Sequence, residues 1–469
     1  MKISGFIIPF GISTIGFIAY LASVYVNVTF SIILSAILLS QFLYVTYLLL
    51  NKNALQNETS SQENCDSPNL PSISIIIPAY KESNIMKHIF GKVEKIRYGP
   101  EKIQWILALE PDDIDMIKSL KKVCDVIEEY DGLPTKLSYK KTIIDIAYNK
   151  SGIKTKPAAL NEALKIARGE IIGIYDAEDI PQADHALIAA DLMMKDEDIV
   201  VVQFSRVAAV NHNTWLEKGQ KVESEIYREL YTKMAQRFGF SPILGSGYYV
   251  RKKILEAVGG WHPVHPAEDL DLTYRILKMK KTYKIITIDK PTITQAVAGL
   301  RIFLKQRIRW VKGCIISLPK ALFGGKRAIH VGMLTSISSL LALLGLIWFF
   351  FGFLSNVIMF VTRYTGETPP LISLLANMPL ILLLCIYSIM IMRMKKNLSK
   401  KEIFFFYVLI GLEVAISLIA AMEAIIAPGK WHKTVHVAYI SGTREINIDT
   451  SVLNLQILNR LIDFTFSLR

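Results

Sequence analysis

The sequence predicts an α/β domain with a mostly parallel sheet, set between membrane-spanning segments. Short β-type runs alternate with helical stretches from Pro71 to about Gly325, the pattern of a parallel sheet covered by helices. Long blocks without charge flank this region, at 3–50, 331–362 and 371–392. Each block reaches the roughly 20 apolar residues that a membrane-spanning helix needs.

Composition supports a membrane protein. The chain has 469 residues, a net charge of +13 and a mean hydropathy of +0.33. A basic excess of this kind is typical of cytoplasmic loops and of attraction to anionic lipids, and no RNA- or DNA-binding module is visible. We therefore expect membrane lipids and no nucleic acid among the partners. Five basic residues within 393–401 predict a cytoplasmic loop, with the catalytic domain on the same side of the cell membrane.

The predicted division of the chain follows from these blocks. Two transmembrane helices occupy 1–52, a polar linker 53–70 and the α/β domain 71–298; amphipathic interface helices occupy 299–325, transmembrane helices 326–428 and a cytosolic tail 429–469. Ile403–Ala427 is ambiguous because Glu413 and Glu423 are costly in lipid. Either this segment enters the membrane and returns, or the block at 331–362 is interrupted.

Three predicted strands end in polar or acidic residues. Ile73–Ile77 runs into Pro78-Ala79-Tyr80-Lys81-Glu82, and Gln104–Leu109 runs into Glu110-Pro111-Asp112-Asp113. The third is Ile171–Ile174, and two further strands are predicted at 142–148 and 199–204. A helix with Pro157 in its first turn and Gly169 past its end precedes the third acidic strand end. Ligands of open α/β sheets bind beyond the carboxyl ends of the strands, so one crevice would receive all three loops.

The third strand end carries the highest density of carboxylates, namely Asp176, Glu178 and Asp179, before Pro181 stops the run. Such a group suits a hard divalent cation, and Mg²⁺ usually shares its coordination shell with substrate phosphates. A solvated acidic turn is the alternative, and on this stretch alone the two interpretations are equally supported.

Three later motifs each permit a functional and a structural interpretation. Gly245-Ser246-Gly247, after a helical stretch at 214–238, allows a close backbone approach to a ligand or forms a plain turn. Glu268 and Asp269 are candidate catalytic carboxylates, or they stabilise the start of an amphipathic helix. The basic amphipathic stretch 299–323, with Gln306-Arg307-Ile308-Arg309-Trp310, is predicted to lie in the membrane interface, as part of the site or as an anchor alone.

In this order, the motifs resemble those of the membrane-integrated glycosyltransferases of family 2, the superfamily of cellulose synthase and hyaluronan synthase. The resemblance covers about 71–310 and implies a glycosyltransferase A-type, Rossmann-like fold. It also implies a nucleotide-sugar donor, with a UDP-sugar favoured, a glycan or lipid acceptor, and Mg²⁺ or Mn²⁺ as cofactor. It gives no information on accessory subunits.

The resemblance also assigns roles to residues. Asp269 becomes the catalytic base, with Glu268 beside it, and Asp176 becomes a metal ligand together with Glu178 or Asp179. The family more often has two aspartates separated by one residue, so Asp-Ala-Glu-Asp leaves the second ligand open, with Glu178 favoured by spacing. The remaining assignments are donor binding by Tyr80, Glu82, Glu110, Asp112, Lys156, Asp176, Gln306, Arg307 and Arg309, and acceptor binding by Gly245, Ser246, Gly247 and Trp310.

These residues suit an inverting transfer. Asp269 would deprotonate the attacking hydroxyl, while the divalent cation, Arg307 and Arg309 would neutralise the departing diphosphate. The first hypothesis is a processive β-glycan synthase that moves its polymer through the membrane. The second is an enzyme that adds one sugar to a lipid carrier or membrane lipid. A third, from another class, is an inactive scaffold or transporter, against which the complete set of carboxylates argues.

Overall fold

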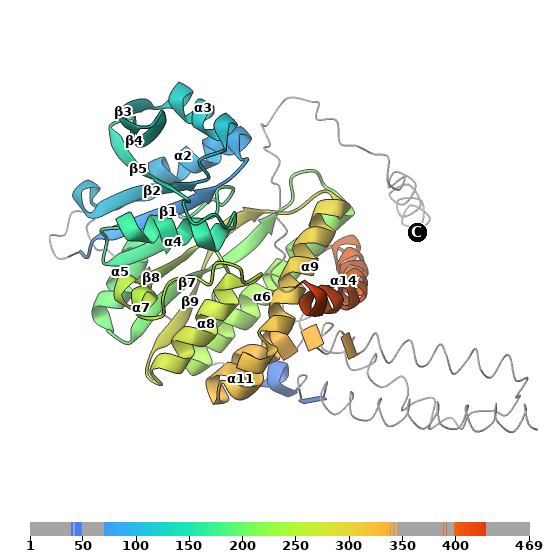
Figure 1. The fold of residues 1–469 in the computed structure, drawn as a ribbon. Helices are drawn as coiled ribbons and strands as arrows, with labels where there is room; N and C mark the ends of the chain where they lie inside the picture. The colour runs from blue at the N-terminus through green and yellow to red at the C-terminus, as the bar shows by residue number, and fades with distance from the viewer. Residues whose placement is uncertain are drawn as a thin grey trace, which may run out of the picture.

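A mixed β-sheet forms the centre of the computed structural model (Figure 1). The structure describes residues 39–40, 43–48, 70–337, 339–340, 343–344, 388, 391 and 398–427. The predicted linker, the tail and most of the predicted membrane spans lie outside these residues, and the proposed domain boundaries remain predictions.

The strand order within the described residues is β3-β4-β5-β2-β1-β6-β8-β7-β9. The four central strands β5, β2, β1 and β6 are parallel, and β7 and β9 are also parallel to each other. Antiparallel pairing joins β3 to β4, β4 to β5, and β8 to both β6 and β7. The strands are β1 Ile73–Ala79, β2 Ile103–Leu109, β3 Asp125–Tyr130, β4 Leu133–Tyr139, β5 Thr142–Tyr148, β6 Ile171–Ile174, β7 Ile199–Ala209, β8 Tyr248–Arg251 and β9 Lys284–Gln295.

The five strands predicted from apolar runs are all present, whereas β3, β4, β8 and β9 were not predicted. The β3–β4 turn has a clear sequence pattern, because Asp131 and Gly132 both adopt positive φ, of 51° and 75°. Asp-Gly between two β runs is a strong hairpin pattern. The strand β3 itself is fully exposed, so it lacks the apolar run by which the other strands were found.

Helices cover both faces of the sheet. Alternate residues of a strand point to opposite faces. Ile76 of β1 and Ile106 of β2 accordingly join one core cluster, with α4, α6 and α8, while Ile75 and Ile77 join the other, with α2, α3 and α5. These helices are α2 Met86–Lys95, α3 Ile114–Val123, α4 Lys156–Ile166, α5 His185–Lys195, α6 Trp215–Phe238 and α8 Glu268–Met279; short 3₁₀ turns lie at Ser83–Ile85 and Pro100–Lys102, and α7 at Lys252–Ala257.

The helix ends follow local sequence. Thr214 and Glu217 form a capping box at the start of α6, and Gly239 ends that helix with φ of 73°. Thr155 caps α4, where it accepts a hydrogen bond from the Ala158 amide. These ends match the helices predicted at 157–169 and 214–238 to within a few residues.

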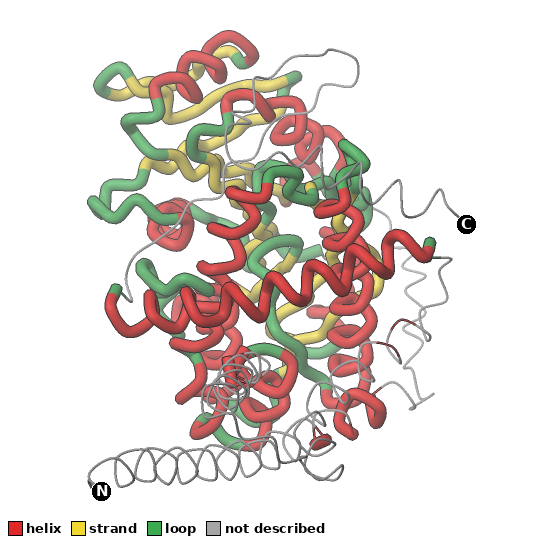
Figure 2. The backbone as a smooth tube through the Cα atoms, turned by 90° about the vertical axis from the view of Figure 1, so that its right-hand side faces the viewer, coloured by secondary structure: helices red, strands yellow, loops and turns green. Residues whose placement is uncertain are grey.

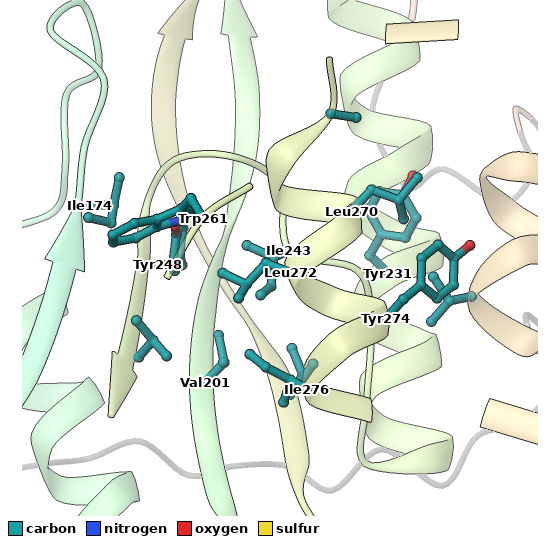
Figure 3. Close-up of a cluster of buried hydrophobic side chains, with 14 of the residues drawn as sticks. Ile174, Val201, Tyr231, Ile243, Tyr248, Trp261, Leu270, Leu272, Tyr274 and Ile276 are labelled. Carbon is teal, nitrogen blue, oxygen red and sulfur yellow. The ribbon is translucent and has the colours of Figure 1, made fainter. Parts of the chain in front are cut away.

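Helix α8 is held by its apolar face. Leu270, Leu272 and Ile276 point into the core cluster that includes Val201 of β7 and Tyr231 of α6 (Figure 3). Leu272 and Ile276 are fully buried. The first turn of α8, which carries Glu268 and Asp269, is therefore fixed on the rigid body of the domain.

The predicted amphipathic stretch forms α9 Leu300–Ile316 and α10 Leu318–Phe323, and α11 Lys326–Leu334 follows. Within the described residues one helix, α14 Lys400–Ile426, is long and apolar enough to cross a membrane, a test of length and composition that the core helix of a soluble protein also passes. It packs along α6 and α9, on the helical side of the molecule that faces the viewer in Figure 2. Phe405, Leu409 and Ile416 are buried there against Trp215 and Phe303.

Candidate active site

An ammonium group joins three of the predicted motifs. Lys156, at the start of α4, donates to Oδ1 of Asp176 at 2.5 Å and to the carbonyl oxygen of Gly245 at 2.8 Å. Its Nζ also lies 3.8 Å from Oε1 of Glu268. Burial works against the charged ammonium, but the carboxylates of Asp176 and Glu268 outweigh it and raise the pKa of Lys156. The motifs that the sequence placed far apart thus meet at one cation.

Contacts of Asp179 with Ser246 and Arg206 anchor the acidic loop after β6. Asp179 is fully buried, accepts a hydrogen bond from the Ser246 hydroxyl, and lies 3.3 Å from Nη2 of Arg206. The same Ser246 oxygen accepts the Asp176 amide at 2.8 Å. Because Asp179 is committed to these contacts, Asp176, with 21% of its side chain exposed, presents the more accessible carboxylate.

Glu268, which is buried, and Asp269, which is partly exposed, form an acidic pair at the first turn of α8. Burial raises the pKa of Glu268 to about 7, against the opposing effect of Lys156, and also raises the pKa of Asp269. Repulsion from the Asp269 carboxylate adds to the rise in the pKa of Glu268. Oδ1 of Asp269 accepts the Leu270 amide at 2.8 Å. A carboxylate with a raised pKa in a polar crevice suits general acid–base catalysis.

The Gly245-Ser246-Gly247 turn forms the wall beside this pair. Gly245 and Gly247 have φ of 77° and 67°, and a Cβ on Gly245 would lie 3.0 Å from Oδ2 of Asp269. A Cβ on Gly247 would lie 2.6 Å from Oγ1 of Thr292. Both glycines are therefore required by conformation and by close approach.

Helix α9 is fastened to the start of α8. Arg309 donates to the carbonyl oxygen of Pro266 at 2.9 Å, and a Cβ on Gly313 would lie 2.4 Å from Cβ of Ala267. The positive charge of Arg309 also favours the ionised forms of Glu268 and Asp269. The predicted motif on α9 thus adjoins the acidic pair.

The ends of β1 and β2 supply the other predicted donor-binding residues. Glu110 is buried, and its carboxylate accepts a hydrogen bond from the side-chain amide of Asn149 at 2.7 Å. Asp112 is exposed and pairs with Lys154 at 2.5 Å. Glu82 is buried, and Tyr80 is partly exposed at the end of β1. Both strands are parallel to β6, so these residues share its edge of the sheet.

Arg307 lies in a buried ion pair, and its contact with the diphosphate stays a prediction. The sequence assigned it to the diphosphate, but its guanidinium forms a buried ion pair with Glu223 of α6, and Nη1 lies 3.1 Å from Glu413 of α14. On an α-helix, side chains two positions apart point in different directions, which separates Arg307 from Arg309. Of the other residues in this motif, Gln306 is buried and Trp310 is 37% exposed.

Sequence reasoning missed two cations beneath the acidic loop. Lys92 of α2 is buried and donates to the Ala177 carbonyl oxygen at 2.6 Å. Burial lowers the pKa of Lys92 to about 8, and Asp179, Glu178, Asp176 and Glu82 oppose that shift. Arg206 of β7 donates to the Leu244 carbonyl oxygen and contacts Asp179. Arg206 is the one charged residue in β7, a pattern that marks it for attention, whereas Lys92 resembles an ordinary helix-surface lysine.

The loop suits a hard cation in its donor chemistry. Asp176 offers carboxylate oxygens, and Glu178 lies two residues away but is only 6% exposed. In the described part of the chain, no group of three or more His, Cys, Asp or Glu side chains is arranged to hold a metal. A divalent ion at Asp176 would therefore take its remaining ligands from diphosphate oxygens and water, as Mg²⁺ commonly does.

These features define a class of protein. The mixed sheet with its acidic strand ends has the glycosyltransferase A-type fold, as predicted. The mannosyltransferase PcManGT from Pyrobaculum calidifontis, solved in complex with GDP-Man and Mn²⁺, matches with a TM-score of 0.55 over 85% of this chain and 99% of that chain. The two sequences are 17% identical, so this likeness concerns the fold.

The family follows from a direct match. Residues 171–392 match the family model of glycosyl transferase family group 2, so this part of the chain is a family 2 glycosyltransferase domain. The resemblance to family 2 glycosyltransferases inferred from the sequence is confirmed, and membrane integration stays a prediction.

Two curated relatives differ in their products. The β-monoglucosyldiacylglycerol synthase of Trichormus variabilis is 26% identical over 248 residues, or 52% of this chain and 49% of its own length. The cellulose synthase catalytic subunit of Pseudomonas fluorescens is 20% identical over 248 residues, covering 52% of this chain and 31% of its own. The chain therefore spans about half the length, or less, of these relatives.

Proposed function

We propose that the chain transfers a sugar from a nucleotide-sugar to an acceptor hydroxyl, with inversion at the anomeric carbon. One observation carries this proposal: Lys156 bridges Asp176, at the end of β6, to Glu268, which adjoins Asp269. The carboxylate proposed to bind the metal and diphosphate is thereby held close to the proposed catalytic carboxylates.

Asp269 is the proposed base. It accepts the proton of the acceptor hydroxyl as the hydroxyl oxygen bonds to the anomeric carbon, and the bond between that carbon and the diphosphate oxygen breaks. Glu268, whose pKa burial raises to about 7, keeps negative charge beside Asp269 low at neutral pH. Lys156 supplies positive charge on the diphosphate side, and Arg309 supplies it beside Glu268 and Asp269.

A divalent cation fits the diphosphate side. Asp176 would hold it, and Glu178 is the proposed second carboxylate if its side chain turns outward. When bound, Mg²⁺ or Mn²⁺ would neutralise charge on the leaving diphosphate. PcManGT, with the same fold, was solved with Mn²⁺ and GDP-Man, which supports both a metal and a nucleotide-sugar donor. We retain a UDP-sugar as the favoured donor.

The proposed acceptor is a membrane lipid or a lipid carrier. The glucosyldiacylglycerol synthase relative has the higher identity of the two relatives described above, over an equal share of this chain. The exposed apolar side chains of α14, which include Leu418, Ile419 and Ile425, would bring the site to a lipid surface, consistent with a membrane location. A growing polysaccharide is the second candidate, because the cellulose synthase subunit is also a relative.

Product analysis tests both parts of the proposal. Purified full-length protein in lipid vesicles would be incubated with radiolabelled UDP- and GDP-sugars and Mg²⁺ or Mn²⁺. Label in a one-sugar lipid supports the first acceptor, and label in a polymer that resists lipid extraction supports the second. Absence of transfer from every donor, with a protein that unfolds cooperatively, would contradict the proposed activity.

A further inference from the structure

A buried cluster of charge joins three helices outside the catalytic crevice. Arg307 of α9 donates from Nη1 to Oε1 of Glu223 at 2.8 Å and from Nη2 to Oε2 of the same residue, a two-pronged pair with α6. Oε1 of Glu413 on α14 lies 3.1 Å from Nη1. The side chains of Arg307 and Glu223 are 8% and 6% exposed, and that of Glu413 is 18% exposed.

The same guanidinium lies against two aromatic rings. Its central carbon is 4.6 Å from the ring centroid of Trp310 and 4.9 Å from that of Phe303. A planar guanidinium can stack on a ring while both of its prongs bind a carboxylate, which a lysine ammonium cannot do. Phe303 is fully buried, whereas Trp310 is 37% exposed, so of these two rings Trp310 has the greater access to a ligand.

The opposite side of α9 is fixed to the catalytic pair. Arg309 bonds the Pro266 carbonyl oxygen, and Gly313 packs on Ala267, directly before Glu268. Helix α9 is thus held from two directions. One face of α9 contacts the segment beside the proposed base. The other face carries Trp310, which the sequence assigned to acceptor binding.

We propose that Arg307 is a positioning residue that holds the Trp310 ring for the acceptor, and that Glu223 and Glu413 anchor it. This inference rests on the proposed glycosyl transfer. Since Arg307 acts through Trp310, its loss would weaken use of the acceptor and leave binding of the donor intact. Through Glu413, the docking of α14 becomes part of acceptor recognition.

A double-mutant cycle tests the link between the two residues. Arg307→Lys keeps the charge and loses the two-pronged geometry; Trp310→Phe keeps a smaller ring. Acceptor KM and kcat would be measured for both single variants, the double variant and the parent. We expect Arg307→Lys to raise acceptor KM by about tenfold in the parent and by less than about twofold in the Trp310→Phe background, because residues in contact are coupled. Equal effects in both backgrounds would overturn the proposal.

Two further measurements separate positioning from general stability. Hydrolysis of the donor in the absence of acceptor, and affinity for the nucleoside diphosphate, should stay within about twofold of the parent. A parallel fall of these quantities with thermal stability would mean that Arg307 is only structural. If Arg307→Lys does not fold, Glu413→Gln, at the more exposed edge of the cluster, replaces it in the same cycle.

Lys221→Gln is the matched control. It removes the 2.8 Å pair between Lys221 of α6 and Glu402 of α14, which also joins these helices and has no contact with Trp310. We expect its acceptor KM to equal that of the parent. A rise as large as that of Arg307→Lys would assign the effect to loosening of α14 and overturn a specific role for Arg307.

Failure of the proposed function is distinguishable from failure of this inference. If the parent transfers no sugar, the Trp310 contribution to fluorescence, obtained by subtraction of the Trp310→Phe spectrum, still tests the contact. Release of the ring in Arg307→Lys should increase its quenching by acrylamide. Unchanged quenching would show that other contacts hold Trp310.

Discussion

The ammonium of Lys156 lies 2.5 Å from Oδ1 of Asp176, so a cation of the chain occupies one side of the carboxylate proposed to bind a metal. The same ammonium is 3.8 Å from Glu268. Lys156 therefore balances charge on both the diphosphate side and the base side of the crevice.

Removal of Asp176 should separate metal-dependent from metal-independent donor binding. In Asp176→Ala, we expect affinity for a nucleoside diphosphate to become independent of Mg²⁺ or Mn²⁺, because the accessible carboxylate is gone. Calorimetric titration with and without the metal measures this difference. Asp125→Ala, on the exposed strand β3, is the control. A metal effect that persists undiminished in Asp176→Ala would place the ion elsewhere.

Neutralisation of the base should stop the chemistry and spare donor binding. Asp269→Asn keeps the shape of the side chain and cannot accept the hydroxyl proton, so turnover should fall by roughly 100-fold or more. Donor affinity should match the parent, because Asp269 acts on the acceptor. Unchanged turnover would refute the assignment.

Activity should depend on pH through the acidic pair. Burial raises the pKa of Glu268 to about 7 and raises the pKa of its neighbour Asp269. Protonation inactivates a base, so kcat/KM should fall, by up to tenfold per unit, as pH decreases through the raised pKa of Asp269. The two carboxyl groups titrate as a pair. Glu268→Gln leaves one titrating carboxyl, so the inflection of the plot of kcat/KM against pH should move. A plot identical to that of the parent would argue against coupled titration of the two carboxyl groups.

Gly245 should not tolerate a side chain. Alanine at φ of 77° carries a conformational cost of about 1–2 kcal/mol, and its Cβ would lie 3.0 Å from Oδ2 of Asp269. We expect Gly245→Ala to lower kcat strongly and the midpoint of thermal unfolding only slightly. Gly152→Ala, at a positive φ in open space, is the control for backbone strain alone. Equal loss of activity in both variants would exclude a specific effect on Asp269.

Lys92 should stabilise the fold chiefly when the metal is absent. Lys92→Met removes one of the cations near these carboxylates and leaves the Ala177 carbonyl oxygen without its 2.6 Å hydrogen bond, a loss that costs roughly 1–3 kcal/mol. A divalent cation at Asp176 would offset part of this loss. Thermal unfolding in EDTA and in Mn²⁺ tests this expectation: the deficit relative to the parent should shrink with metal. An equal deficit in both buffers would contradict it.

The parts of the fold that the sequence predicted were those with a local pattern. The buried strands β1, β2 and β6 are mostly apolar, and α6 has a capping box and a terminal glycine. The strand β9 was missed because Lys284–Gln295 alternates buried and partly exposed residues without a long apolar run.

The candidate site was predictable where chemically suitable residues lie next to the end of a strand or helix. Asp176 follows strand β6, Gly245 precedes strand β8 and Glu268 begins helix α8, so topology brings them together. The direction of Arg307 depends on Glu223 and Glu413, which lie 84 and 106 residues away along the chain, and no local pattern encodes that partnership. Lys92 was missed for the same reason, since its partner is the backbone of Ala177.

Three acidic residues recur along nearly the same side of α14. Each lies close to a lysine or arginine side chain of the rest of the protein. Glu402 pairs with Lys221, Glu413 with Arg307, and Glu423 lies 3.9 Å from Lys312, which also bonds the carbonyl oxygen of Ala427. Both ends of this 27-residue helix therefore rest on one rigid body. In terms of membrane topology, we predict that α14 adds no crossing, because both of its ends contact the same domain.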